Sequence, residues 1–126
     1  MNPLCEKITD SELLVMQVLW EKGESMSLTE LRRAVQERSG WEQSTVKTLI
    51  RRLCDKGALS QEKREVYYYS PNLSEDEYNA DATESFLHRI YRGSARRLVA
   101  ALVEKNDLSE QDVAELMELF RTEDKA

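Results

Sequence analysis

The segment from Trp41 to Tyr69 limits the possible folds of this chain more than any other part of it. It reads WEQSTVKTLIRRLCDKGALSQEKREVYYY. In its first half, apolar residues recur at i, i+3, i+4 and i+7, which is the period of one buried helix face. These residues are Val46, Leu49, Ile50 and Leu53. The positions between them are mostly polar, so the pattern predicts a helix that buries one side and exposes the other.

Both ends of this predicted helix carry local signals. Ser44 is suited to cap its start, because a serine hydroxyl accepts a hydrogen bond from an unpaired N–H of the first turn. Lys56 and Gly57 indicate its end, since a cation complements the helix C-terminus and glycine accepts the left-handed conformation beyond it. After the glycine, residues 58–61 and 66–69 are short strand candidates on either side of a charged turn. They predict a β-hairpin.

Two further helices are predicted upstream by capping boxes. In such a box, a serine or threonine and a glutamate three residues later each satisfy the other's backbone N–H. Thr9 and Glu12 open the first helix, and Ser27 and Glu30 open the second. The second of these helices is joined by a tight turn to the helix after Trp41, which has the polar face. This arrangement is typical of a helix-turn-helix, which places its second helix in the major groove of DNA. With the hairpin added, the sequence predicts a mainly helical, winged helix-turn-helix domain.

Positive charge is concentrated where this fold would meet DNA. The whole chain carries −6, yet residues 43–64 contain six basic and two acidic side chains, 6 − 2 = +4. An acidic protein can bind DNA only through a localised patch, because phosphate contacts need cations gathered on one face. In the hairpin, Glu62 and Glu65 weaken the attraction of the neighbouring cations for phosphate. The candidate DNA-binding residues are Ser44, Thr45, Lys47, Thr48, Arg51, Arg52, Lys63 and Arg64.

The chain is predicted to divide into a DNA-binding domain, residues 1–71, and a three-helix dimerisation domain, residues 72–126. The acidic excess lies in the second part, and Ser74 with Glu77 provides a capping box for its first helix. Helices this short can hardly bury all their apolar surface alone, so pairing with a second copy of the chain is expected. The candidate dimerisation residues are Phe86, Ile90, Leu98, Leu102, Val113, Leu116, Met117 and Phe120. The alternative is that these helices complete a monomeric core or bind a different protein.

Other functional classes find little support in the sequence. His88 is the single histidine and has no cysteine or serine partner at a recognisable spacing, so no catalytic site is expected. Cys5 and Cys54 form no metal-binding motif, and no metal or other cofactor is expected. The sequence shows no apolar run long enough for a signal peptide or a membrane-spanning helix. This favours a cytoplasmic protein without a membrane partner. A winged-helix adaptor that contacts proteins instead of DNA remains the alternative function.

Four stretches of the chain carry a family resemblance. They are WEQSTVKTLIRRLCDKGAL at 41–59, YYYSP at 67–71, RIYRG at 89–93 and LVEKNDLS at 102–109. Together they resemble the penicillinase and methicillin-resistance repressor family, which also includes copper-responsive repressors. The match covers nearly the whole chain, and its central stretch is the most specific part.

This resemblance implies a homodimeric winged-helix repressor that blocks transcription by occupying a palindromic operator in double-stranded DNA. It places one helix of each copy in the major groove. The residues that the resemblance puts there are Thr45, Lys47, Thr48 and Arg51. Arg52 is expected to join the last three as a principal contact.

Two departures from the family pattern concern the inducing signal. Copper-responsive members carry a pair of C-x-C motifs near the C-terminus, whereas this chain ends in ELFRTEDKA, so copper sensing there is not expected. In the antibiotic-resistance branch, a sensor protease or a pathway that it triggers leads to cleavage at an Asn-Phe bond. The corresponding residues here are Ala101 and Leu102, so either the cut site has shifted or induction works differently. A sensor protease is therefore a candidate partner, because a cut in this region would separate the dimer contacts from the DNA-binding domain.

Overall fold

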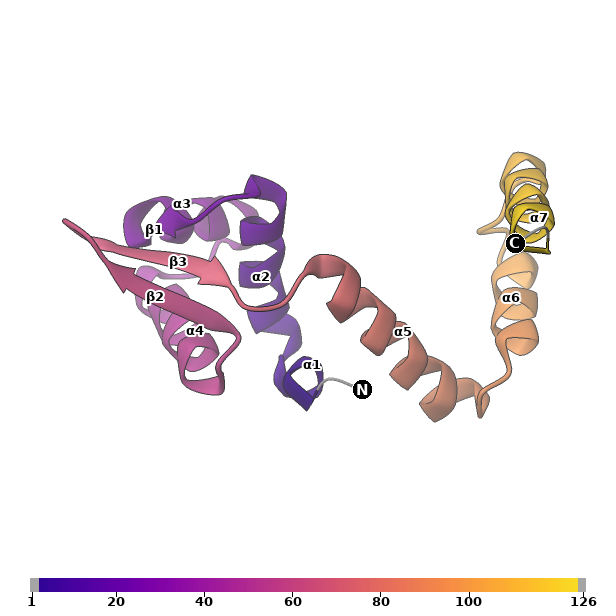
Figure 1. Ribbon diagram of the computed structural model, residues 1–126, viewed down its shortest axis with the longest axis horizontal. Helices are drawn as coiled ribbons and strands as arrows, with labels where there is room; N and C mark the ends of the chain where they lie inside the picture. The colour runs from indigo at the N-terminus through magenta and orange to yellow at the C-terminus, as the bar shows by residue number, and fades with distance from the viewer. Residues whose placement is uncertain (1–2, 125–126) are drawn as a thin grey trace. The chain divides into compact units, whose positions relative to one another are not determined.

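The computed structural model describes residues 3–124, so the outermost ends of the two predicted domains, residues 1–2 and 125–126, lie outside the described part. Figure 1 shows the order of its elements. They are α1 (Pro3–Lys7), α2 (Asp10–Lys22), β1 (Met26–Ser27), α3 (Leu28–Ser39), α4 (Gln43–Lys56), β2 (Leu59–Lys63), β3 (Tyr67–Pro71), α5 (Glu75–Tyr91), α6 (Ala95–Glu104) and α7 (Glu110–Asp124). None of these described helices is both long and apolar enough to cross a bilayer. The fold is mainly helical with one small sheet, as the sequence predicted.

The core of the first part of the chain forms where α2, α3 and α4 pack against one another. Met16 and Leu19 of α2, Leu31 of α3, and Ile50 and Leu53 of α4 are almost completely buried. Burying a side chain of this size contributes about 1.5–3 kcal/mol relative to leaving it exposed. Ile50 and Leu53 belong to the apolar face that the helical spacing predicted.

Side-chain caps determine where α2 and α3 begin. The N–H of Glu12 donates to Oγ1 of Thr9 at 3.2 Å, and the N–H of Thr9 donates to Oε1 of Glu12 at 3.0 Å. Ser27 and Glu30 form the same reciprocal pair at the start of α3. Both predicted capping boxes are therefore confirmed, and each helix starts where its box places it.

The sheet is antiparallel and its strand order is β1-β3-β2. β2 and β3 form the predicted hairpin, or wing, with Lys63 opposite Tyr67 near its turn. β1 pairs with the other edge of β3 and places Met26 opposite Tyr69. The sequence did not predict β1, because a strand of two residues is too short to show any alternation.

The start of α5 belongs to the same packed unit as the three-helix core. The chain divides into two compact units, and the boundary between Thr83 and Glu84 falls inside α5. The indole N–H of Trp20 donates to the carbonyl oxygen of Leu73 at 3.0 Å, and its ring centroid lies 5.7 Å from that of Tyr78. The first packed unit thus extends to Thr83. The boundary predicted after residue 71 separates two functions, DNA binding and dimerisation, and stays a prediction.

The short helix α1, which no sequence pattern predicted, also packs in the first unit. Its Cys5 is buried and hydrogen-bonds the side chain of Asp81 in α5. Burial, and after it Asp81, raises the pKa of Cys5 to about 11. The thiol therefore stays protonated at neutral pH and serves packing.

From Glu84 onward, apolar side chains are mostly left in solvent. None of the described side chains between Glu84 and Arg121 is buried. The large apolar side chains that this unit exposes are Phe86, Ile90, Val99, Val103, Val113, Leu116, Met117, Leu119 and Phe120. Contiguous exposed apolar surface often marks interaction sites, so the association predicted for this part of the chain stays a prediction.

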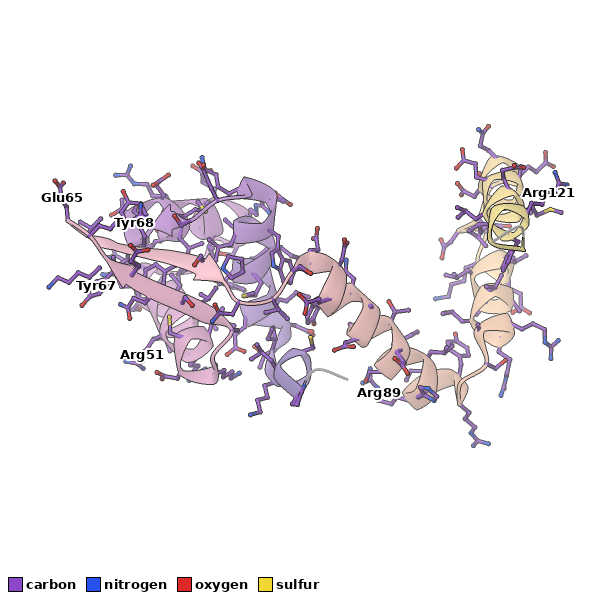
Figure 2. The ribbon with its side chains drawn as sticks, viewed as in Figure 1. Arg51, Glu65, Tyr67, Tyr68, Arg89 and Arg121 are labelled. Atoms are coloured by element: carbon purple, nitrogen blue, oxygen red, sulfur yellow. The ribbon has the colours of Figure 1, made fainter. Side chains whose placement is uncertain are left out.

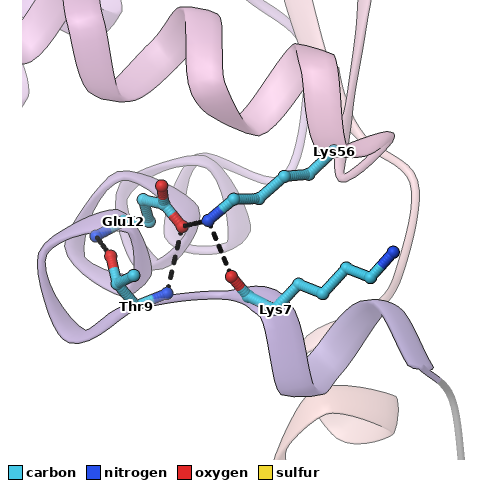
Figure 3. Close-up of polar contacts among 4 residues, drawn as sticks. All are labelled: Lys7, Thr9, Glu12 and Lys56. Carbon is cyan, nitrogen blue, oxygen red and sulfur yellow. Dashed lines mark hydrogen bonds and ion pairs between the residues drawn. The ribbon is translucent and has the colours of Figure 1, made fainter.

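A buried ion pair joins the start of α2 to the end of α4, as Figure 3 shows. Only 1% of the Glu12 side chain is exposed, and Nζ of Lys56 lies 2.6 Å from its Oε1. The same Nζ donates to the carbonyl oxygen of Lys7 at 2.7 Å. Burial alone raises the pKa of Glu12, but hydrogen bonds from Lys56 and from the Thr9 backbone outweigh it, so the pKa lies below its ordinary value. Lys56 thus neutralises Glu12, although its charge is one of the six positive charges of residues 43–64.

Replacing Glu12 by glutamine should lower the free energy of unfolding by about 2 kcal/mol at pH 7, because glutamine can retain the cap but lacks the charge that Lys56 faces. A lowered pKa in the folded state means that the carboxylate stabilises the fold fully above the ordinary pKa of 4.5. This stabilisation is lost as the pH falls through the lower, folded value. Urea unfolding of wild type and Glu12→Gln should therefore show a gap that narrows below pH 4.5.

The matched control is Glu30→Gln, which makes the same change in the capping box of α3, where the glutamate is exposed. Its cost should stay within about 0.5 kcal/mol, as for most surface substitutions. If the gap between wild type and Glu12→Gln does not change with pH, the ionised carboxylate is not what stabilises this junction.

Candidate nucleic-acid interface

α4 presents a polar face on the side opposite its buried stripe. The stripe consists of Val46, Leu49, Ile50 and Leu53, which are all buried. Among the predicted contacts on this helix, Ser44, Thr45, Lys47, Arg51 and Arg52 are exposed, and Thr48 is half-buried. Figure 2 shows Arg51 projecting outward from the helix. The structure therefore brings all six predicted side chains of α4 to accessible positions, while their contact with DNA stays a prediction.

The start of α4 differs from the starts of α2 and α3. Its N-cap residue is Glu42, and the side chain of Glu42 makes no cap hydrogen bond to the first turn. The prediction that Ser44 caps α4 was wrong, because the helix already begins at Gln43 and Ser44 lies within its first turn. The first amide groups of a helix have no partner inside it, and the helix dipole makes this end attractive to anions. With Lys47 nearby on an open hollow that Glu42, Gln43 and Ser44 also line, this end can accept a phosphate group.

The hydroxyl groups of α4 sit beside one of its arginines. A shallow hollow on the helix surface is lined by Ser44, Thr45, Thr48, Leu49 and Arg52. The hydroxyl of Thr48 donates to the carbonyl oxygen of Ser44 at 2.9 Å. Its oxygen consequently remains available as an acceptor, beside a guanidinium group that can only donate.

Lys47 and Arg51 form part of a hollow of about 190 Å³ whose lining also includes residues of the sheet. The other lining residues are Leu28, Ile50, Cys54, Gln61 and Tyr69. Burial, followed by the charge of Asp55, raises the pKa of Cys54, so its thiol stays neutral. Gln61 was not among the predicted contacts, since only the folded hairpin brings it near Lys47 and Arg51.

The two cations of the hairpin have different surroundings. Nε of Arg64 lies 3.4 Å from Oε1 of Glu62, and its guanidinium carbon lies 4.6 Å from the ring centroid of Tyr68. Nζ of Lys63 lies 5.9 Å from the ring centroid of Tyr67. Both tyrosines are labelled on the hairpin in Figure 2. A carboxylate competes with phosphate for Arg64, so Lys63 is the more available of these two cations.

Comparison with known proteins assigns the family. Residues 8–122 match the model of the penicillinase repressor family. The chain belongs to this family. It is 35% identical over 115 residues to the penicillinase repressor of Bacillus licheniformis, and the match covers 90% of this chain and 89% of that protein. The methicillin resistance regulatory protein MecI of Staphylococcus aureus is 29% identical, with 90% of this chain and 93% of that protein covered.

Solved structures that cover 57% of this chain support its fold. The solution structure of the DNA-binding domain of the repressor BlaI is 38% identical, with a TM-score of 0.52 over 57% of this chain and 88% of that chain. Monomeric BlaI of Bacillus licheniformis, solved in complex with the blaP half-operator, is 36% identical with a TM-score of 0.51 and the same coverage. The predicted winged helix-turn-helix is thereby confirmed.

Replacing Glu42 by serine should stabilise the DNA-free protein by about 0.5–1 kcal/mol, because a serine hydroxyl can accept an N–H of the first turn of α4. Urea unfolding of the two proteins measures this gain. The control is Ser27→Ala, which removes an existing cap at α3 and should cost about 1 kcal/mol. An unchanged stability in Glu42→Ser would mean that the first-turn amides already have partners.

Proposed function

We propose that this protein is a transcriptional repressor that binds a specific site in duplex DNA as a homodimer and acts by binding, without catalysis. The observation that carries the proposal is the exposed cationic face of α4 above a buried apolar stripe, in a chain of the penicillinase repressor family. The complex of its relative BlaI with a half-operator supports DNA as the partner.

In the proposed complex, α4 lies in the major groove. Arg51 donates hydrogen bonds to a base edge, which an arginine does best with guanine. Lys47, Lys63 and the first amide groups of α4 bind phosphates, and these contacts fix the orientation of the protein without reading the sequence. Since Arg64 is paired with Glu62, we assign it a smaller share of the phosphate binding.

A second copy of the chain covers the apolar surface of the second unit. The residues proposed for this contact are Phe86, Ile90, Leu98, Leu102, Val113, Leu116, Met117 and Phe120; Leu98 and Leu102 are half-buried in the single chain and the other six are exposed. A two-fold dimer would space two copies of α4 by one turn of DNA or a multiple of it, which requires a palindromic operator.

Relief of repression by a sensor protease is part of the proposal. Ala101 and Leu102 are half-buried inside α6, and a protease requires the helix to open locally. In the single chain α6 contains no buried residue, so its opening there costs little free energy compared with the opening of the core. In the dimer, Leu98 and Leu102 must also leave their proposed contact. A cut between the two would detach α7 and reduce the avidity of the paired DNA-binding units.

Replacing Arg51 by alanine should weaken binding to the preferred duplex by about 1–3 kcal/mol and relax the sequence preference at one position, because one base contact is lost. Lys63→Ala should weaken binding to all duplexes similarly and reduce the slope of log K against log salt by about one. Fluorescence anisotropy with a duplex selected from a random pool, and with a scrambled duplex, measures both effects.

The control is Lys22→Ala, which removes a cation at the end of α2, outside the proposed interface, where it pairs with Glu24. This variant should bind both duplexes as wild type does. If the affinity of the wild-type protein is insensitive to salt, the proposal of DNA binding fails, since phosphate contacts release counterions.

Replacing Leu116 by aspartate should produce monomers, because it places a charge in the proposed apolar contact. Sedimentation equilibrium measures the molecular mass, and anisotropy should show a parallel loss of affinity for a palindromic duplex. Gln111→Asp is the control, since it adds the same charge on the opposite side of α7 by helical spacing. If Leu116→Asp stays dimeric, the dimer contact lies elsewhere.

A further inference from the structure

Lys56 belongs to α4 but takes no part in the proposed DNA-facing surface. It follows Leu53 by three residues and therefore lies on the flank of the buried stripe. Figure 3 shows its ammonium group at the start of α2, where Nζ donates to Oε1 of Glu12 at 2.6 Å and to the carbonyl oxygen of Lys7 at 2.7 Å. One side chain thus links the end of α4 to the end of α1 and the start of α2.

The acceptors of Lys56 are themselves held in place. Oε1 of Glu12 also accepts the N–H of Thr9, so the capping box of α2 fixes the carboxylate. The side chain of Lys56 is 27% exposed and that of Glu12 is 1% exposed, so the pair is largely removed from water. Ion pairs in such surroundings are much less screened than surface pairs.

Anchoring at this end matters because the other end of α4 is open. The N-cap residue Glu42 makes no side-chain cap hydrogen bond there, so the helix depends more on the buried stripe and on the Lys56 contacts. Hydrogen bonds to base edges require donor–acceptor distances within about a few tenths of an ångström of the optimum, and well-aligned angles. Phosphate contacts tolerate larger shifts. A change in the angle of α4 should consequently affect specific binding more than non-specific binding.

We propose that Lys56 is a positioning residue for sequence recognition. By bonding Glu12 and the carbonyl group of Lys7, it fixes the C-terminal end of α4 and sets the angle at which Arg51 meets the bases. The charge of Lys56 is used inside the protein, so it is not one of the phosphate contacts. This inference rests on the proposed function, since it concerns how the same helix reads DNA.

Lys56→Met, Lys56→Arg and Glu12→Gln test the proposal in the full-length chain. Binding is measured by anisotropy over a series of KCl concentrations, at a temperature where circular dichroism shows every variant folded. The probes are a duplex that the wild-type protein selects from a random pool and a scrambled duplex. Lys22→Met is the matched control, because it makes the same change in the last turn of α2, where the lysine lies 3.8 Å from Glu24 in an exposed pair.

Lys56→Met should weaken binding to the selected duplex by about tenfold, comparable to the loss of one base contact. Binding to the scrambled duplex should change less than about twofold, with the salt slope unchanged because no phosphate contact is lost. Glu12→Gln should reproduce the loss of preference, and Lys56→Arg should recover most of it. Lys22→Met should behave as wild type.

Two binding results for Lys56→Met would overturn the inference. Equal weakening on both duplexes, with the salt slope reduced by about one, would make Lys56 a phosphate contact. An unchanged preference in Lys56→Met would leave it without a role in recognition. A wild-type protein that selects no sequence would instead overturn the proposed function, and with it the recognition role of Lys56.

Amide hydrogen exchange in the absence of DNA distinguishes a failure of the role of Lys56 from a failure of the proposed function. The last turn of α4 should exchange faster in Lys56→Met than in Lys22→Met, because its anchor to α1 and α2 is gone. This result would support anchoring even if no operator were found. Equal exchange in the two variants would show that Lys56 does not hold the helix, and the inference would fail on structural grounds alone.

Discussion

The burial of one side of α4 is the constraint on which the rest of the structure depends. Val46, Leu49, Ile50 and Leu53 pack against α2 and α3, so the helix cannot rotate without exposing them to water. Each of these side chains stabilises the buried orientation by about 1.5–3 kcal/mol. The polar side chains of the same helix face outward as a consequence. The surface proposed to read DNA therefore arises from the packing of the core.

The starts of α2 and α3 could be predicted from the sequence, because a capping box involves residues only three positions apart. The cap predicted at Ser44 was wrong, since a serine near a helix start is as compatible with the first turn as with the cap. β1 was missed for a different reason: its two residues become a strand only by pairing with β3, far along the chain. Local periodicity carries no information about such a pairing.

The candidate site, like the fold, could be predicted from the sequence only where neighbouring residues determine it. The outer face of α4 followed from helical spacing, but Gln61 joined it only through the folding of the hairpin. The sequence also could not separate Lys56 from the other cations, because its partner Glu12 is 44 positions away. Net charge along a segment thus gives the location of a basic surface, while the fold decides which cations remain available to a ligand.

The uncapped start of α4 has a thermodynamic consequence for the proposed repressor. A phosphate that occupies those amides binds only the folded helix, so the operator would act as the missing cap. The recognition helix would then gain order from the molecule that it recognises. Occupancy and folding become linked, and the melting temperature of the protein should rise with the logarithm of the operator concentration.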